Sequence, residues 1–266
     1  MRKDLEKKKE QRIGEVNKSI EGYEIKIIKY NGRGDIIVEF QDKYKANVHT
    51  SYQCFKNGQI KNPNHPSVYF VGYIGQGIYT TAKNGRHTKI YNTWVGLLER
   101  CYNPYCINKN LSYKDCFVCE EWHNYQNFAK WYEENYYEIL NEKMHLDKDI
   151  LIKGNKIYSP ETCLFVPQRI NELFTKCDRQ RGEFPIGVGY HKRDDVLLVQ
   201  CSIKDREGKR KNKHLGYFPL NKPFQAFYTY KIFKEQYVKQ VADEYKHLIP
   251  QKLYEAMYNY EVEIND

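Results

Sequence analysis

The sequence lacks the long apolar runs of a membrane protein. No stretch reaches the roughly 18 consecutive apolar residues that a bilayer-spanning helix needs. The segment that opens the sequence, MRKDLEKKKEQR, carries six basic and three acidic side chains with no apolar run behind it, which does not favour a secretory signal. We therefore expect a cytoplasmic protein without a membrane partner.

The cysteines do not form the pattern of a disulfide-stabilised or zinc-binding protein. Eight cysteines are scattered irregularly along 266 residues, so we expect reduced thiols. Cys116 and Cys119 form a single C-x-x-C pair, whereas a structural zinc site needs four ligands. The pattern favours apolar packing of this pair over structural zinc. The other candidate ligands are single and dispersed: Cys101, Cys106, Cys163 and His123.

Acidic residues are too few to balance the basic ones. The formal net charge is +9, and 25 tyrosines dominate an aromatic fraction of 15%. Tyrosine combines a flat apolar ring with a hydroxyl, which suits small cores, interfaces and nucleic-acid surfaces. A basic chain favours a polyanionic partner, of which DNA and RNA are the commonest.

Residues 1–78 predict a helix followed by a small β module. The charged segment from Lys3 to about Ile20 is compatible with a helix. Two β-rich runs then flank the turn Asn31–Gly34, which indicates a hairpin. The apolar residues 67–75 (SVYFVGYIG) predict a further strand. Nothing in these residues indicates what the module does.

The next part of the sequence has two stretches with apolar residues at three- and four-residue spacing. Residues 88–103 and 120–140 each place these residues on one helix face. We interpret both stripes as core packing rather than as platforms on which bases stack. Their positions are Tyr91, Trp94, Leu97, Leu98 and Cys101, and Trp122, Tyr125, Phe128, Trp131 and Tyr132.

The last part predicts a three-stranded antiparallel sheet backed by a helix. The β-rich runs are residues 186–193, 196–205 and 213–218. The second run alternates, so that one face packs and the other meets solvent or a ligand. Its apolar positions are Leu197, Val199, Cys201 and Ile203, and its polar positions are Gln200, Ser202 and Lys204.

A helix follows this sheet. Asn221 is the predicted N-cap, and Pro223 suits the first turn. The apolar stripe of the helix is Ala226, Tyr230, Phe233 and Tyr237. A final helix is expected over residues 251–260, after the break at Pro250.

Basic residues concentrate on this predicted sheet. Between Arg181 and Lys222 there are ten lysines and arginines against five acidic residues. Cationic side chains on such a ribbon can neutralise phosphates, while arginine, glutamine and serine can reach base edges. The alternative is an ordinary solvated sheet face with a basic loop. The candidate DNA-binding residues are Lys192, Arg193, Gln200, Ser202, Lys204, Arg206, Lys209, Arg210, Lys211 and Lys213.

About sixty residues of this part resemble an AP2 domain. The resemblance is carried by Gly187-Val188, the alternating second strand, the block His214–Phe218, and the helix with Ala226 and Tyr230. It implies a three-stranded antiparallel sheet that lies in the DNA major groove with a helix behind it. The sequence departs from the family at the strand's usual tryptophan, and only Arg193 mirrors its arginines, so no base preference carries over.

The preceding segment resembles the HNH-type homing endonucleases of phages. The matching stretches are Leu146-Asp147-Lys148-Asp149 and the block Gly154–Phe165 (GNKIYSPETCLF). Phage proteins that pair this block with an AP2-like tail also share the aromatic helices. The resemblance implies a ββα-metal nuclease scaffold over roughly residues 79–180.

The residues that such a nuclease needs are only partly present. The resemblance assigns a divalent cation, Mg²⁺ or another, to Asp147 and, loosely, to Asn171. Lys148 stands where the active enzymes have the general-base histidine, and an ordinary lysine is protonated at neutral pH. Thr162 replaces an asparagine that fixes the loop or binds metal. His145 shares the strand face of Asp147 and can substitute as base or ligand.

In a second interpretation, Asp147, Asp149 and Asn155 only hold a turn together.

Taken together, the segments predict an α+β fold. It consists of a small β module (1–78), an HNH-like ββα region with aromatic helices (79–180) and an AP2-like domain with a C-terminal helix (181–266).

Three functions stay open. The first is double-stranded DNA binding with impaired cleavage, in the cytoplasm of a bacterial host if the gene is phage-encoded. The second is an active Mg²⁺-dependent DNA endonuclease centred on Asp147. The third is a phage-encoded inhibitor that binds a host protein. The many tyrosines suit a protein interface as well as they suit a DNA-binding surface.

Overall fold

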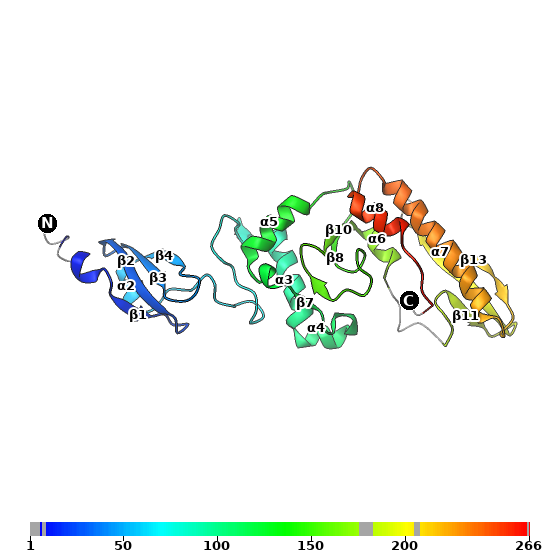
Figure 1. Cartoon of the computed structure of the whole chain (residues 1–266), viewed down its shortest axis with the longest axis horizontal. Coiled ribbons are helices and arrows are strands. Elements are labelled where there is room, and N and C mark those ends of the chain that lie inside the picture. The colour runs from blue at the N-terminus through cyan, green and yellow to red at the C-terminus, as the bar shows by residue number, and fades with distance from the viewer. Residues whose placement is uncertain (1–5, 7–8, 176–182, 205–207, 265) are drawn as a thin grey trace. The chain divides into compact units, whose positions relative to one another are not determined.

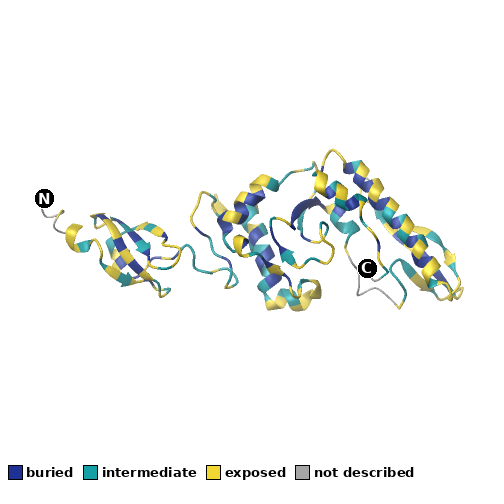
Figure 2. Cartoon of the chain, viewed as in Figure 1, coloured by how far each residue is buried: buried dark blue, intermediate teal, exposed yellow. Residues whose placement is uncertain are grey.

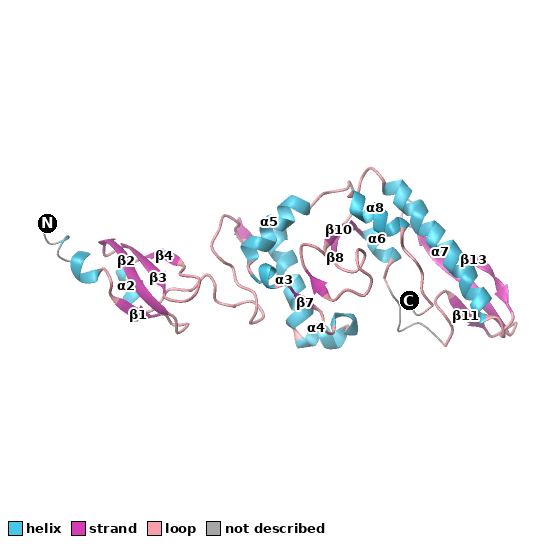
Figure 3. Cartoon of the chain, viewed as in Figure 1, coloured by secondary structure: helices cyan, strands magenta, loops and turns pink. Residues whose placement is uncertain are grey.

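The chain folds into mixed helices and strands, as the sequence predicts (Figure 1 and Figure 3). The computed structural model describes residues 6, 9–175, 183–204, 208–264 and 266. Contacts divide the chain into two compact units, Met1–Glu134 and Asn135–Asp266. The boundary falls inside the predicted segment 79–180, so the aromatic helices and the ββα region belong to different units. Within the described ranges, no helix has both the length and the apolar character needed to cross a bilayer.

The first unit begins with a four-stranded antiparallel sheet in which sequence neighbours pair. Buried and exposed residues alternate along its two longest strands, and the buried face packs against Phe55 (Figure 2). The predicted hairpin is confirmed, with Arg33 and Gly34 between the paired residues Gly32 and Asp35. Its elements are β1 (Val16–Lys18), β2 (Glu24–Gly32), β3 (Asp35–Phe40), β4 (Asn47–Thr50) and α2 (Tyr52–Lys56).

Two aromatic helices, α3 (Lys89–Tyr102) and α5 (Tyr125–Asn135), form the rest of the first unit's core. Most of both predicted stripes is buried, and Trp94 Nε1 donates a hydrogen bond to the Trp122 carbonyl at 2.7 Å. The helix predicted over residues 120–140 is shorter than expected. Trp122 lies in a separate 3-10 turn before α5, and α5 ends at Asn135, five residues before the predicted end. The smaller elements are β5 (Ala82–Lys83), β6 (Arg86–His87), α4 (Pro104–Lys109), η1 (Leu111–Tyr113), β7 (Phe117–Val118) and η2 (Glu120–His123).

Two predictions for this unit are wrong. The helix expected up to Ile20 gives way to β1, because Val16–Lys18 pairs with β2. Residues 67–75 form a tight turn rather than a strand, with Val68 bridged to Gly72. Gly72 lies so close to α3 that an added Cβ would come within 2.4 Å of Leu98, so a larger residue at this position would have to displace that side chain.

The second unit builds a short hairpin and a three-stranded sheet on one long helix. The 23-residue helix α7 spans about 35 Å at 1.5 Å per residue. Its first half, with Ala226 and Tyr230, packs on the sheet, and its second half, with Val238 and Val241, packs on the hairpin. The elements are β8 (Met144–Asp147), β9 (Ile157–Tyr158), β10 (Leu164–Pro167), α6 (Gln168–Leu173), β11 (Val188–His191), β12 (Val196–Lys204), β13 (Arg210–Phe218), α7 (Pro223–Tyr245) and α8 (Gln251–Tyr258).

The predicted C-terminal sheet and its helix are confirmed, with β12 between β11 and β13. The predicted cap is wrong by one residue. Lys222 is the N-cap of α7, without a side-chain cap hydrogen bond, and Pro223 occupies the first helical position. Proline fixes φ at a helical value and has no backbone N–H that would need a cap at the first helical position. α7 therefore begins without an Asn221 cap.

Candidate nucleic-acid interface

The strand register divides the side chains of the C-terminal sheet between two faces. Along β12, Leu197, Val199 and Cys201 are buried under α7, and Gln200 and Ser202 are exposed on the other face. This is the alternation that the sequence predicted. The face turned away from α7, here called the outer face, is therefore open and polar at Gln200 and Ser202, and half-buried and apolar at Val196 and Leu198.

A β-bulge decides which residues of β13 join the outer face. Val199 pairs with Gly216, but the next residue, Gln200, pairs with His214, so Leu215 is an extra residue on β13. Beyond the bulge, a one-residue shift exchanges the faces of the strand. Because of this shift, the side chains of Arg210, Asn212 and His214 share the outer face, whereas those of Lys211 and Lys213 lie on the α7 side. Without the bulge the assignment would be reversed.

The outer face carries groups that can contact bases. Gln200 pairs with His214 and Ser202 with Asn212, and all four side chains are exposed. Tyr217 is 54% exposed, with its ring centroid 4.6 Å from that of His214. The sequence prediction named Gln200 and Ser202 but missed Asn212, His214 and Tyr217, because only the cross-strand register places them together.

The turn between β11 and β12 holds two predicted DNA-binding cations, Lys192 and Arg193, both exposed. Two carboxylates in the same turn offset their charge. Asp194 Oδ2 lies 3.2 Å from His191 Nδ1, and Asp195 accepts a 2.7 Å hydrogen bond from the Tyr190 hydroxyl. This bond raises the pKa of Tyr190. The turn is therefore close to neutral.

The opposite end of the sheet is strongly basic. Lys209 and Arg210 are exposed there, and Arg206 lies outside the described residues. Lys204 forms an ion pair with the Glu172 carboxylate, whose Oε2 is also 3.6 Å from Arg210 Nη2. The hydrogen bond from Lys204 lowers the pKa of Glu172 below its ordinary value. One carboxylate of α6 thus partly neutralises this cationic end.

The second unit also contains two paired strands and a following helix in the segment where the sequence predicts a ββα region. β8 and β10 pair antiparallel, with Asp147 opposite Leu164, and α6 follows β10 directly. His145 pairs with Val166 and therefore shares the face of Asp147. Asn171 lies on α6. The side chains of these elements decide what the region can do.

Asp147 and Lys148 both hold the loop after β8. Asp147 Oδ1 accepts hydrogen bonds from the backbone N–H of Asp149 at 2.7 Å and of Ile150 at 2.8 Å, and burial raises the pKa of Asp147. Lys148 is 6% exposed, and its Nζ donates to the Asp149 carboxylate and, at 2.8 Å, to the Asn155 carbonyl. These two bonds connect Lys148 to both sides of the loop.

The remaining loop residues complete this network. Asn155 Nδ2 donates to the carbonyl oxygens of Lys148 and Ile157, at 2.9 and 2.7 Å. Thr162, at the position of the family asparagine, donates to the Ile157 carbonyl at 2.7 Å. The contacts of this loop agree with the second interpretation, in which these residues stabilise a turn.

The donor set does not fit the divalent cation that the resemblance implies. Across the described ranges, no three His, Cys, Asp or Glu side chains are grouped as a metal site would require. Oδ1 of Asp147 already accepts two backbone N–H groups, and Asn171 offers an amide oxygen, a weaker ligand than a carboxylate for a hard cation.

The C-x-x-C pair lies in the first unit. Cys116 is buried and its Sγ donates to the Ser112 carbonyl at 3.5 Å, while Cys119 is half-buried. His123 Nε2 lies 3.0 Å from the Val118 carbonyl.

Comparisons of the chain with protein-family models, curated proteins and solved structures found no match.

Proposed function

We propose that this chain binds double-stranded DNA through the outer face of β11, β12 and β13. The observation that carries the proposal is the register that places Gln200, Ser202, Asn212 and His214 together on an exposed face backed by α7. An antiparallel ribbon has the width of the DNA major groove, and amide, hydroxyl and imidazole groups can bond to base edges there.

Charge supports the same surface. Lys204, Lys209 and Arg210 lie at one end of the ribbon, and cations at that position can contact backbone phosphates. Phosphate contacts position the protein and base contacts select the sequence, so the ribbon combines the two kinds of group that a DNA reader needs. A cytoplasmic location and reduced cysteines are part of this proposal.

Fluorescence anisotropy with labelled duplex DNA at two salt concentrations tests the proposal. We expect binding that weakens with salt, with a slope of about −0.9 for each phosphate contacted. The double variant Gln200→Ala/His214→Ala should lose roughly tenfold or more in affinity for a selected site, since one good base contact contributes about 1–3 kcal/mol.

A matched control removes the same residue types elsewhere in the second unit. Gln236→Ala/His247→Ala changes two exposed side chains that lie outside the sheet, and it should bind like the wild type. Absent or salt-independent binding by the wild type would refute the proposal. Capture of a host protein that persists after nuclease treatment would instead favour the inhibitor hypothesis.

A further inference from the structure

Two amide side chains of the outer face lie diagonally across β12 and β13. Gln200 of β12 pairs with His214 of β13. Two residues further along β12, Ser202 pairs with Asn212 of β13. Gln200 and Asn212 are therefore diagonal neighbours on one face, and both are exposed. Diagonal neighbours in a sheet are about 7–8 Å apart, or about two base-pair steps of roughly 3.4 Å along DNA.

An amide side chain matches the major-groove edge of adenine. The NH₂ group of the amide donates and its oxygen accepts, while adenine presents an acceptor at N7 beside a donor at N6. Guanine presents two acceptors on that edge, cytosine presents a donor, and thymine presents an acceptor beside its methyl group. Adenine is therefore the base that satisfies both groups of a glutamine or an asparagine at once.

An apolar side chain lies beside Gln200 on the same face. Leu198 precedes it by two residues on β12 and is half-buried. The partner of Leu198 on β11 is Gly189, where an added Cβ would have open space around it. A glycine inside a strand often marks a place where a ligand approaches closely, and this one leaves a flank of Leu198 uncovered. Leu198 is thus placed to contact a thymine methyl group, which marks the other base of an A·T pair in the major groove.

Two cations of the ribbon that could read guanine share one carboxylate. Arginine and lysine bond to guanine through its O6 and N7 atoms. Arg210 Nη2 lies 3.6 Å from Oε2 of Glu172, and Lys204 forms an ion pair with the same carboxylate. A guanine would have to compete with Glu172 for these cations, whereas an adenine meets exposed amides.

We infer that the outer face selects A·T base pairs, with Gln200 and Asn212 each bonding to an adenine and Leu198 contacting a thymine methyl group. The inference rests on the proposed DNA binding and deepens it, because it names the base pairs that the outer face recognises. The diagonal spacing of the amides places the two adenines in adjacent base pairs or in base pairs separated by one.

The first experiment selects binding sites from duplexes with a randomised central segment, using the full-length wild type. The enriched sites should contain two A·T pairs at this spacing. Gln200→Glu should replace one of them by a C·G pair, because a carboxylate accepts a hydrogen bond from the N4 amino group of cytosine. Asn212→Asp should do the same at the other position.

Modified bases in the enriched duplex then locate the contacts. At either adenine, 7-deazaadenine removes the N7 acceptor and should weaken wild-type binding roughly fivefold or more. This loss should disappear at one adenine in Gln200→Ala and at the other in Asn212→Ala. Uracil in place of the contacted thymine removes the methyl group, so it should weaken binding by the wild type but not by Leu198→Ala.

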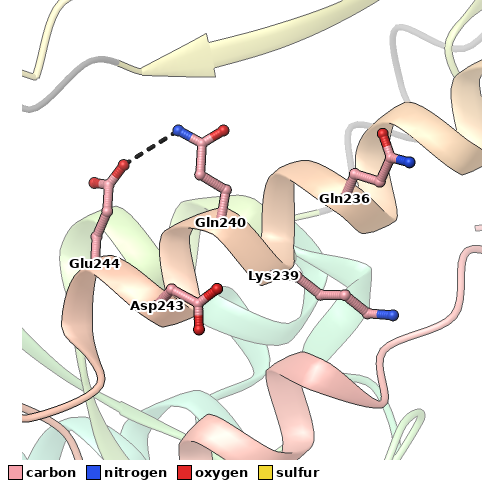
Figure 4. Close-up of a pocket in the computed structure, with 5 residues that line it drawn as sticks. All are labelled: Gln236, Lys239, Gln240, Asp243 and Glu244. Carbon is pink, nitrogen blue, oxygen red and sulfur yellow. Dashed lines mark hydrogen bonds between the residues drawn. The ribbon is translucent and has the colours of Figure 1, made fainter.

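Gln236→Glu is the matched control. It adds the same negative charge at an exposed glutamine of α7, the helix that packs on the other face of the sheet (Figure 4). This variant should keep the wild-type preference for A·T pairs. Circular dichroism checks that each variant keeps the wild-type fold, and the 7-deazaadenine measurement on the wild type needs no variant.

The outcomes separate the two claims. If the wild type binds DNA but enriches no A·T pairs, or tolerates 7-deazaadenine at both of them, the inference is overturned and the proposed function stands. The same holds if folded Gln200→Glu and Asn212→Asp keep the wild-type preference. If the wild type binds no duplex, both claims are overturned.

Discussion

The hydroxyl of Tyr237 gives the sharpest test of how the ribbon is held on α7. Tyr237 Oη accepts a hydrogen bond from the Lys204 backbone N–H at 2.8 Å and donates one to the Lys204 carbonyl at 2.9 Å. One side chain thereby satisfies both backbone groups at the end of β12. Tyr237 is 7% exposed, so water does not readily replace its hydroxyl in a variant.

Tyr237→Phe should destabilise the protein by about 2 kcal/mol, since a buried donor or acceptor that loses its partner costs about 1–3 kcal/mol. Arg169 Nη2 also lies 3.4 Å from the Lys204 carbonyl and can retain part of that bond. For a protein of this size, the change lowers Tm by roughly 4–8 °C.

Urea unfolding and calorimetry measure this effect. Tyr228→Phe is the control, because it removes a hydroxyl from a 59% exposed tyrosine on the same helix. It should leave the free energy of unfolding within about 0.5 kcal/mol of wild type. A Tyr237→Phe variant as stable as this control would show that the hydroxyl does not hold the strand end, and the reasoning would be wrong.

Two further predictions concern buried charge. Asp147→Ala should cost about 1 kcal/mol or more, because two backbone N–H groups lose their acceptor, whereas Asp147→Asn keeps an oxygen there and should cost less. Both variants should nick supercoiled plasmid with Mg²⁺ no more slowly than the wild type; faster nicking by the wild type would assign Asp147 to catalysis. Burial lowers the pKa of Lys234 below its ordinary 10.5, so its charged form is disfavoured in the folded state. Lys234→Met should therefore raise stability at pH 7 by roughly 1 kcal/mol. Wild-type stability rises as the folded lysine loses its proton, so this advantage should shrink between the lowered pKa and pH 10.5. Urea unfolding of both proteins at several pH values measures it, and a constant difference would argue against the buried charge.

The outcome for β12 and β13 shows which patterns can be predicted from sequence. Along β12, strict alternation of Leu197, Val199 and Cys201 with polar residues predicts the buried face, because a side-chain period of two is a property of any strand. Along β13, the same rule fails at Leu215, since an extra residue reverses the faces beyond it. Gly216, next to the extra residue and at a φ of +150°, is a local signal of a bulge, but the sequence alone does not show which partner residues it shifts.

The amino-acid sequence by itself determined the mixed fold, the stripes of both aromatic helices and the sheet–helix order near the C-terminus. These follow from short-range periodicity, which is the same in every protein. Tertiary structure alone decided that α7 supports both the hairpin and the sheet, and that Lys211 and Lys213 lie on the α7 side of the sheet. Such features depend on contacts between residues far apart in the chain, where packing and strand register set which side chains meet.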